Sequence, residues 1–235
     1  MQVFFKDIDS AFSTINIKLT EQQKQQFYNY YTMLIEWNEK FNLTTITDKS
    51  DVIKKHFLDS CCGANFIKQN SYVLDIGAGA GFPSLPLKIL RPDLKLVLID
   101  SVNKKVTFLQ EVINKLNLQN TTALHTRAED FAKKSEYREG FDFVVSRAVS
   151  KLNTLSEYAL PFLKQKGLLI AYKSIDTEHE IAESKNALNI LGGKIKSVED
   201  VSYEDNVRKL IFVQKNFKTP NKYPRSGNKP RLMPL

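Results

Sequence analysis

Residues 75–83 read Asp-Ile-Gly-Ala-Gly-Ala-Gly-Phe-Pro and begin at the end of an apolar run, 71–76, that is typical of a buried β-strand. Glycines at such a turn let the backbone bend tightly and bring its amide groups close to a ligand. The helix that follows accepts Pro83 in its first turn and adds the positive end of its dipole. We therefore expect a ligand with a carboxylate or a phosphate to bind here; the alternative is a tight turn with a structural role alone.

Two ligands, a dinucleotide and S-adenosylmethionine, bind turns of this type. A dinucleotide fingerprint counted from Gly77 requires Gly or Ala where this chain has Phe82. Asp75 is placed to face the positive amino group of a methionine moiety, whereas it would repel a pyrophosphate. Asp100 ends the next apolar run, where a carboxylate accepts hydrogen bonds from both ribose hydroxyls of either ligand. These residues, with Gly79, favour S-adenosylmethionine as the cofactor.

Short apolar runs alternate with amphipathic segments on both sides of this turn. Strands are predicted at 71–76, 95–100, 121–126, 141–146 and 167–173, and helices at 83–91, 103–117, 153–165 and 176–191. Two further alternating runs, 194–203 and 207–215, predict an antiparallel pair at the sheet edge. Strands and helices at this spacing imply right-handed crossovers. The predicted fold is α/β, a Rossmann-like class I S-adenosylmethionine-dependent methyltransferase with a seven-stranded, mostly parallel sheet and helices on both faces.

The first 70 residues read as a helical cap on that domain. Thr20 and Gln23 have capping-box spacing, and an aromatic-rich stripe follows at helical intervals: Phe27, Tyr30, Tyr31, Leu34, Trp37 and Phe41. A second helix is predicted to begin near 48–51, with a shared side formed by Val52, Ile53, His56, Phe57 and Cys61. We expect three parts, the N-terminal helical cap at 1–70, the methyltransferase domain at 71–216 and a basic C-terminal arm at 217–235.

The net charge of +8 comes entirely from the C-terminal part of the chain. Residues 206–235 contain eight Lys and Arg residues and no acid, so residues 1–205 carry no net charge. A basic cluster favours a polyanionic partner; the alternative is a solubilising tail. The last 20 residues also hold four of the eight prolines, which predicts an extended, loosely ordered arm.

Composition narrows the class of protein. Hydrophobic residues make up 42% of the chain, which predicts a packed core. No apolar run approaches the roughly 18 residues that a membrane span needs, and Asp7 and Asp9 interrupt the region where a signal peptide would be apolar. The two cysteines, Cys61 and Cys62, are adjacent and too few for a structural zinc site. We expect a soluble cytoplasmic protein with no membrane partner and no metal.

The residues after the fourth strand, Ser146-Arg147-Ala148, should meet the acceptor, because the first and fourth strands bound the crevice of such a sheet. They include neither the Asn/Asp-Pro-Pro-aromatic segment of enzymes that methylate amino groups of bases nor a Pro-Cys nucleophile. An acceptor that needs no deprotonation accounts for both absences. After the third strand, Ala128 and Glu129 lie beside the crevice, where they can pair with an adenine edge; alternatively, the segment caps a short helix.

Several blocks occur together in one order: NLTTITD, HFLDS, LDIGAGAGFPSLPLKI, LIDSVNKKVTFL, RAED, SRAV and KYPR. This set resembles the bacterial small-subunit ribosomal RNA methyltransferase G family, also called glucose-inhibited division protein B, from about residue 28 to residue 230. The glycine turn is common to many methyltransferases, whereas the ordered set is far more specific. The resemblance implies S-adenosylmethionine-dependent methylation of a guanine N7 in 16S rRNA, in naked RNA or in the small subunit. It also implies cofactor contacts from Gly77, Phe82, Ala128, Glu129 and Arg147.

Guanine N7 carries a lone pair and no proton, so its attack on a sulfonium methyl group requires positioning more than a general base. We therefore expect no catalytic acid or base, and we expect Arg147, Lys173, His56 and Asp59 to position the acceptor. A bidentate Arg147 on guanine O6 and N7 would block the nucleophile, so Arg147 should hold cofactor, phosphate or another base edge. His56 and Asp59 are equally compatible with a structural pair on one helix.

RNA contacts are expected from the C-terminal strand and arm, at Lys222, Tyr223, Arg225 and Lys229, with Tyr223 stacking on an unpaired base. After Lys-Tyr-Pro-Arg the arm departs from the longer tails of related proteins. Two other functions remain open, a methyltransferase for a small molecule or protein and a non-catalytic ribosome-binding factor. Four further residues are expected to be structural or solvated, namely His125, His179, Lys104 and Lys105.

Overall fold

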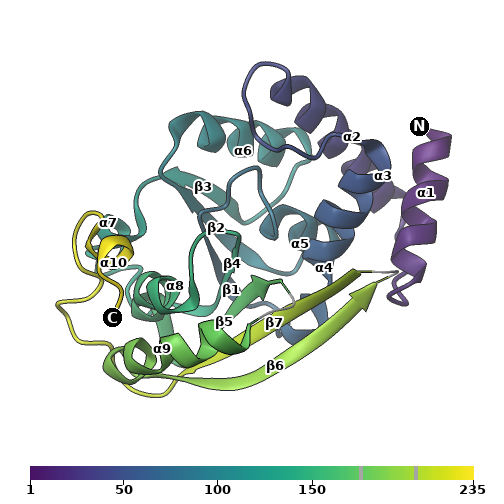
Figure 1. The fold of residues 1–235 in the computed structure, drawn as a ribbon. Helices are drawn as coiled ribbons and strands as arrows, with labels where there is room; N and C mark the ends of the chain where they lie inside the picture. The colour runs from purple at the N-terminus through teal and green to yellow at the C-terminus, as the bar shows by residue number, and fades with distance from the viewer. Residues whose placement is uncertain (175–176, 204–205) are drawn as a thin grey trace.

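The computed structural model of the chain describes residues 1–174, 177–203 and 206–235. Its centre is a seven-stranded sheet with helices on both faces (Figure 1). The strands are β1 (Tyr72–Ile76), β2 (Lys95–Asp100), β3 (Thr121–His125), β4 (Phe141–Arg147), β5 (Leu163–Lys173), β6 (Gly193–Tyr203) and β7 (Asn206–Lys215). They lie in the order β3-β2-β1-β4-β5-β7-β6. Strand β7 runs antiparallel to β5 and β6, and the other pairs are parallel, so the predicted fold class is confirmed.

Each face of the sheet is covered by its own set of helices. The first set comprises α1 (Gln2–Ser13), α2 (Glu21–Asn38), α3 (Lys49–Asp51), a π-helix (Val52–Leu58), α4 (Asp59–Cys61), a 3-10 turn (Ala64–Phe66), α5 (Ser84–Leu90) and α6 (Asn103–Lys115). The second set comprises α7 (Ala128–Phe131), α8 (Leu152–Ala159), a 3-10 turn (Leu160–Phe162) and α9 (Glu178–Leu191), with α10 (Lys229–Leu232) against α8. Strand residues alternate between the two resulting cores, as Val73 and Leu74 do, because side chains of a strand point alternately to opposite faces.

The N-terminal helices share the core of the first face. Thr20 and Gln23 form the predicted capping box, and Phe27, Tyr30 and Leu34 of α2 are fully buried. Phe41, by contrast, lies beyond the end of α2 and is not part of its stripe. The Tyr30 hydroxyl donates a hydrogen bond to the backbone carbonyl of Ala80, so α2 contacts the glycine turn directly.

The predicted second helix begins at Lys49, with Asp48 as its N-cap, and continues through the π-helix into α4. Helix α5 begins one residue later than predicted, because Pro83 is its N-cap rather than part of its first turn. Helix α9 begins at Glu178, and Asp176 of the predicted helix 176–191 lies outside the described residues.

The prediction for residues 153–165 is wrong at its end. Helix α8 stops at Ala159, and β5 already begins at Leu163. The early start of β5 comes from pairing between Leu163 and Phe141, followed by an irregularity in the register. The exposed polar residues at 164–166 hide this strand start from a reading of hydrophobic periodicity.

The expectation of a loosely ordered C-terminal arm is also wrong. In the segment 217–235, Thr219, Tyr223 and Pro230 are buried, and the chain lies against α7 and α8 before it ends (Figure 1). Four hydrogen bonds fasten Arg225 to the fully buried carboxylate of Glu157. Among the described residues, no helix combines the length and the apolar character that a membrane crossing demands.

Candidate functional site

The glycine turn after β1 is held by neighbouring strand ends. The amides of Gly77 and Ala78 donate to the carbonyl of Ile99 at the end of β2, at 2.9 and 3.1 Å. The Gly79 amide donates to Oδ2 of Asp100 at 2.9 Å, while Oδ1 of Asp100 accepts from the Val102 amide at 2.9 Å. Each carboxylate oxygen has a second lone pair for a hydroxyl donor. Asp100 therefore orders the turn and can still accept hydrogen bonds from a ligand.

Beneath the turn lies a buried carboxyl group with one unsatisfied oxygen. Asp75 is fully buried, its Oδ2 accepts from the Ser84 hydroxyl, and its Oδ1 has no hydrogen-bond partner. Burial raises the pKa of the Asp75 carboxyl to about 7. Buried polar atoms without partners are rare in folded proteins. Asp75 lines neither of the two cavities described below, so its orphan oxygen lies beneath the turn rather than in an open pocket.

A cavity of about 400 Å³, here called the β2–β3 cavity, opens at the carboxyl ends of β1, β2 and β3. It brings together Gly77, Asp100, Ala128 and Glu129, four of the predicted cofactor contacts. Ala128 opens α7, whose N-cap is Arg127 without a side-chain hydrogen bond, so Glu129 does not cap that helix. The other residues that line the cavity are Ile76, Ile99, Ser101, Val102, Lys105, Thr126, Arg127, Ala148, Val149, Ser150, Tyr158, Asn228 and Arg231.

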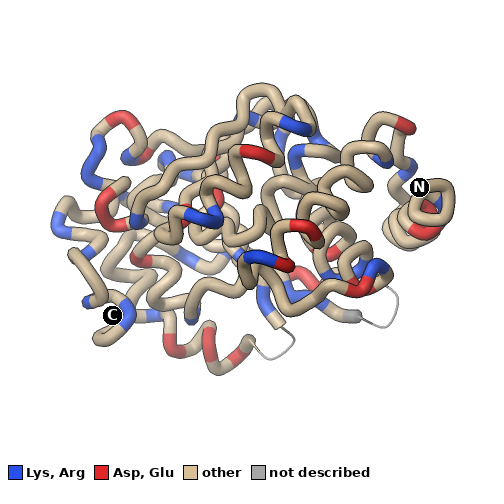
Figure 2. Tube along the Cα trace, turned by 90° about the horizontal axis from the view of Figure 1, so that it is seen from above, with Lys and Arg blue, Asp and Glu red and all other residues tan. Residues whose placement is uncertain are grey.

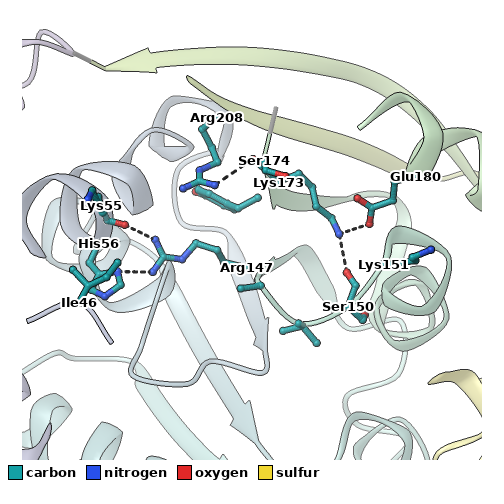
Figure 3. A pocket seen from close by; sticks show the side chains of 13 residues that line it. Ile46, Lys55, His56, Arg147, Ser150, Lys151, Lys173, Ser174, Glu180 and Arg208 are labelled. Carbon is teal, nitrogen blue, oxygen red and sulfur yellow. Dashed lines mark hydrogen bonds and ion pairs between the residues drawn. The ribbon is translucent and has the colours of Figure 1, made fainter. Parts of the chain in front are cut away.

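A second cavity of about 700 Å³, the β4–β5 cavity, lies next to it at the ends of β4 and β5. Three residues of the loop after β4, Ala148, Val149 and Ser150, line both cavities. The cationic residues that line the β4–β5 cavity are Lys55, Arg147, Lys151, Lys173 and Arg208 (Figure 3). Glu180 is the acidic residue among the described ones that line it, and each of the five cations forms an ion pair with a carboxylate in or beside the cavity.

One wall of the β4–β5 cavity is a network built on Asp59. The Asp59 carboxylate is fully buried and accepts from Arg147 Nη1 and from Arg208 Nε, each at 2.6 Å. Arg147 also donates to the Lys55 carbonyl and, through Nη2, to His56 Nδ1 at 3.1 Å (Figure 3). Removing one partner from such a buried charge network is costly, because it leaves an uncompensated charge. The network holds the Arg147 side chain in one orientation.

His56 is neutral in this arrangement. Its Nδ1 accepts from Arg147, so its proton lies on Nε2, 2.8 Å from Thr44 Oγ1. Burial, reinforced by the charge of Arg147, lowers the pKa of His56 to about 4. The ring stacks on Phe82 with centroids 4.2 Å apart, and the Arg147 guanidinium lies 5.0 Å from the same ring.

Phe82 and Asp59 therefore lie behind the cavities rather than in their lining. Lys173, at the end of β5, contacts Glu180 and the Ser150 carbonyl in the β4–β5 cavity (Figure 3). Lys222 and Tyr223 line a separate cavity of about 440 Å³ with Arg138. Tyr223 is only 7% exposed, so its ring is not open for stacking in this structure. Arg225 is bound to Glu157.

The structure also shows residues that the sequence did not single out. Thr44 reaches His56, and Arg208 and Lys151 line the β4–β5 cavity. For Thr44 the available signal was its place in the block NLTTITD, and for Arg208 it was the basic character of the last strand. Lys105, expected on a solvated face, lines the β2–β3 cavity. His125 and His179 stay outside both cavities, and no group of metal-ligating residues occurs in the part of the chain that is described.

Residues 23–211 match the family described as GidB, rRNA small subunit methyltransferase G. A relative of that name from Lactococcus lactis subsp. cremoris is 45% identical over 96% of this chain and 97% of its own length. Another from Staphylococcus aureus is 45% identical over 94% of this chain and 93% of its own.

A solved SAM dependent methyltransferase from Aquifex aeolicus shares the fold, with a TM-score of 0.53 at 21% identity over 77% of this chain and 98% of that one. This likeness shows the fold, in keeping with the seven-stranded, mostly parallel sheet. The chain belongs to the family of rRNA small subunit methyltransferase G proteins.

Proposed function

We propose that this protein transfers a methyl group from S-adenosylmethionine to N7 of a guanine in 16S rRNA, in the cytoplasm. The observation that carries this proposal is the meeting of two unlike cavities at residues 148–150. One is bordered by the Asp100 carboxylate, and the other is lined mainly by cations. A ribose-binding acid on one side and phosphate-binding cations on the other suit a nucleoside donor and an RNA acceptor.

The residues around the β2–β3 cavity fit the donor. Gly77 has a φ of +69°, and a Cβ there would lie 2.6 Å from Val149 Cγ2, so only glycine leaves this approach open. Asp100 would accept from the ribose hydroxyls. Ala128 and Glu129 would meet the adenine. When bound, S-adenosylmethionine supplies a methyl group activated by a sulfonium centre.

The β4–β5 cavity positions the acceptor without a general base. Both ring nitrogens of His56 are engaged, by Arg147 and by Thr44, so His56 holds no free lone pair for an incoming proton. Guanine N7 carries no proton that must be removed, so the orientation of the acceptor is the main contribution to the rate. Arg147 and Asp59 act as positioning residues, and Lys173 offers a cation near the shared loop. Exposed Lys222 and Lys229 extend the RNA contact along the C-terminal segment.

The test is to measure N7-methylguanosine in 16S rRNA from cells that lack the protein. Nucleoside mass spectrometry after digestion should show one N7-methylguanosine lost, and the wild-type gene should restore it. Purified protein with S-adenosylmethionine labelled in its methyl group should label small subunits, or naked 16S rRNA, from those cells.

A variant with Lys185→Ala, an exposed residue of α9 outside both cavities, serves as the matched control and should restore the nucleoside fully. Unchanged N7-methylguanosine in the deletion cells contradicts the proposal. Label transferred to protein or to a small molecule instead of RNA would support the alternative function, a methyltransferase for a small molecule or protein.

A further inference from the structure

Two residues of the C-terminal segment 217–235 line the β2–β3 cavity. Asn228 and Arg231 border it together with Arg127 and Tyr158. Asn228 Oδ1 lies 3.4 Å from Arg127 Nη1, which places Asn228 beside the turn after β3. The chain end therefore forms part of a pocket whose other walls come from residues between 76 and 158.

Buried contacts fasten this chain end to α8. Arg225 and Glu157 form a bidentate ion pair in which the Glu157 side chain is fully buried. Thr154 Oγ1 donates to the carbonyl of buried Pro230 at 3.1 Å. Arg225 also donates to the Met233 carbonyl at 2.8 Å, which closes the segment on itself around α10. Desolvated, hydrogen-bonded pairs of this kind set a geometry, in contrast to exposed surface ion pairs.

The sheet order shows which end of a bound donor this wall would face. The reacting end must point to residues 148–150, because these also line the β4–β5 cavity. The nucleoside end must then extend across Asp100 on β2 toward Ala128 after β3. Asn228, next to Arg127, stands at that nucleoside end.

We propose that the C-terminal segment is a wall of the adenosine pocket, and that Asn228 and Arg231 contact the adenosine of the donor. This inference rests on the proposed function for the identity of the donor. An Asn side chain carries a donor and an acceptor that match an adenine edge, and a planar guanidinium packs well on a purine face. The segment thus forms part of the donor site, and its exposed lysines remain available for contact with RNA.

Calorimetric titration with S-adenosylhomocysteine and, separately, with adenosine tests the proposal without any turnover. Asn228→Ala and Arg231→Ala should each raise the dissociation constant about threefold to tenfold for both ligands. A truncation after Gly227, which keeps Arg225 and Tyr223, should raise it further. Lys218→Ala, an exposed residue of the same segment outside both cavities, removes the same charge as Arg231→Ala and should change it less than twofold.

Wild-type dissociation constants in both point variants and in the truncated protein would overturn the inference. A loss of affinity for small-subunit rRNA with unchanged S-adenosylhomocysteine binding would overturn it too, because the segment would then serve RNA alone. A loss for S-adenosylhomocysteine but not for adenosine would place the wall at the wrong end of the pocket. The proposed function fails separately, if the wild-type protein binds neither nucleoside or if N7-methylguanosine persists in deletion cells.

Discussion

Gly77 and Gly79 share a left-handed backbone but differ in what a methyl group would meet. An added Cβ at Gly77 would clash with Val149, whereas at Gly79 the nearest atom is 3.9 Å away. Gly79→Ala should therefore cost only the left-handed strain, about 1 kcal/mol. Gly77→Ala adds overpacking of about 1–3 kcal/mol and pushes the shared loop outward.

Urea unfolding and titration with S-adenosylhomocysteine measure the two effects. Gly77→Ala should lose more stability than Gly79→Ala and should weaken ligand binding by more. Equal losses in the two variants would show that Val149 moves aside freely and that the close approach at Gly77 has no role.

His56 and Asp75 make opposite contributions to the pH dependence of stability. Burial lowers the pKa of His56 from 6.5 to about 4, so between these values the unfolded chain binds the extra proton and stability rises with pH. Burial raises the pKa of Asp75 from 3.8 to about 7, so between those values the folded protein binds the extra proton and stability falls with pH. The contributions, about 3 and 4 kcal/mol over their full ranges, largely cancel between pH 4 and 6.5.

Single substitutions should expose each contribution. The free energy of unfolding of His56→Gln, relative to the wild type, should decrease as pH rises from about 4 to 6.5. That of Asp75→Asn should increase between about 3.8 and 7. The other groups that surround His56 (Arg147, Asp59 and Asp51) and Asp75 (Ser84, Arg147 and Asp100) are kept in both variants. Urea titrations across this range measure the differences; curves parallel to the wild type would mean that neither group is perturbed.

At the scale of elements, the site is a set of strand ends tied together by one loop. Residues 148–150 after β4 border both cavities, and α2 braces the glycine turn through the Tyr30 hydroxyl. Phe82 at the end of that turn lies between Tyr30 and His56, in ring contact with both. The N-terminal helices thus connect the glycine turn to the network around Arg147.

The identity of the strands followed from the sequence because buried parallel strands are short apolar runs with glycine or polar residues at their ends. The turn residues Gly77 and Asp100 were found for the same reason, since ligands bind where such strands end. Contacts between segments that are distant in the sequence do not appear as a periodic pattern of hydrophobic residues. Arg225 and Glu157 are separated by 68 residues, so the packing of the C-terminal segment was not predicted. The role of Arg208 was missed for the same reason, because its partner Asp59 lies 149 residues away in the sequence.

At the scale of the whole molecule, the net charge overstates the positive field of the C-terminal part. Four of its eight basic residues form ion pairs, Arg208 with Asp59, Lys209 with Asp200, Lys215 with Glu139 and Arg225 with Glu157. The other four, Lys218, Lys222, Lys229 and Arg231, form no ion pair with a described residue. Basic and acidic segments are intermixed over the body of the molecule (Figure 2). The cations of the β4–β5 cavity are ion-paired as well, but Lys151, paired with Glu183, keeps a side chain that is 67% exposed. RNA binding should therefore draw on this residue as well as on the chain end.

The salt dependence of RNA binding separates these two sources. Lys151 lines the β4–β5 cavity with a side chain that is 67% exposed, whereas exposed Lys185 on α9 borders neither cavity. Filter binding of small-subunit rRNA at several salt concentrations should show that Lys151→Ala lowers the slope of log K against log salt by about 0.7–0.9, the release of one phosphate contact. The pair Lys222→Ala with Lys229→Ala should lower it by up to about twice that amount, and Lys185→Ala should not change it. If Lys151→Ala leaves both affinity and slope intact while the tail pair abolishes them, the RNA backbone bypasses the β4–β5 cavity and the acceptor must enter from the side of α10.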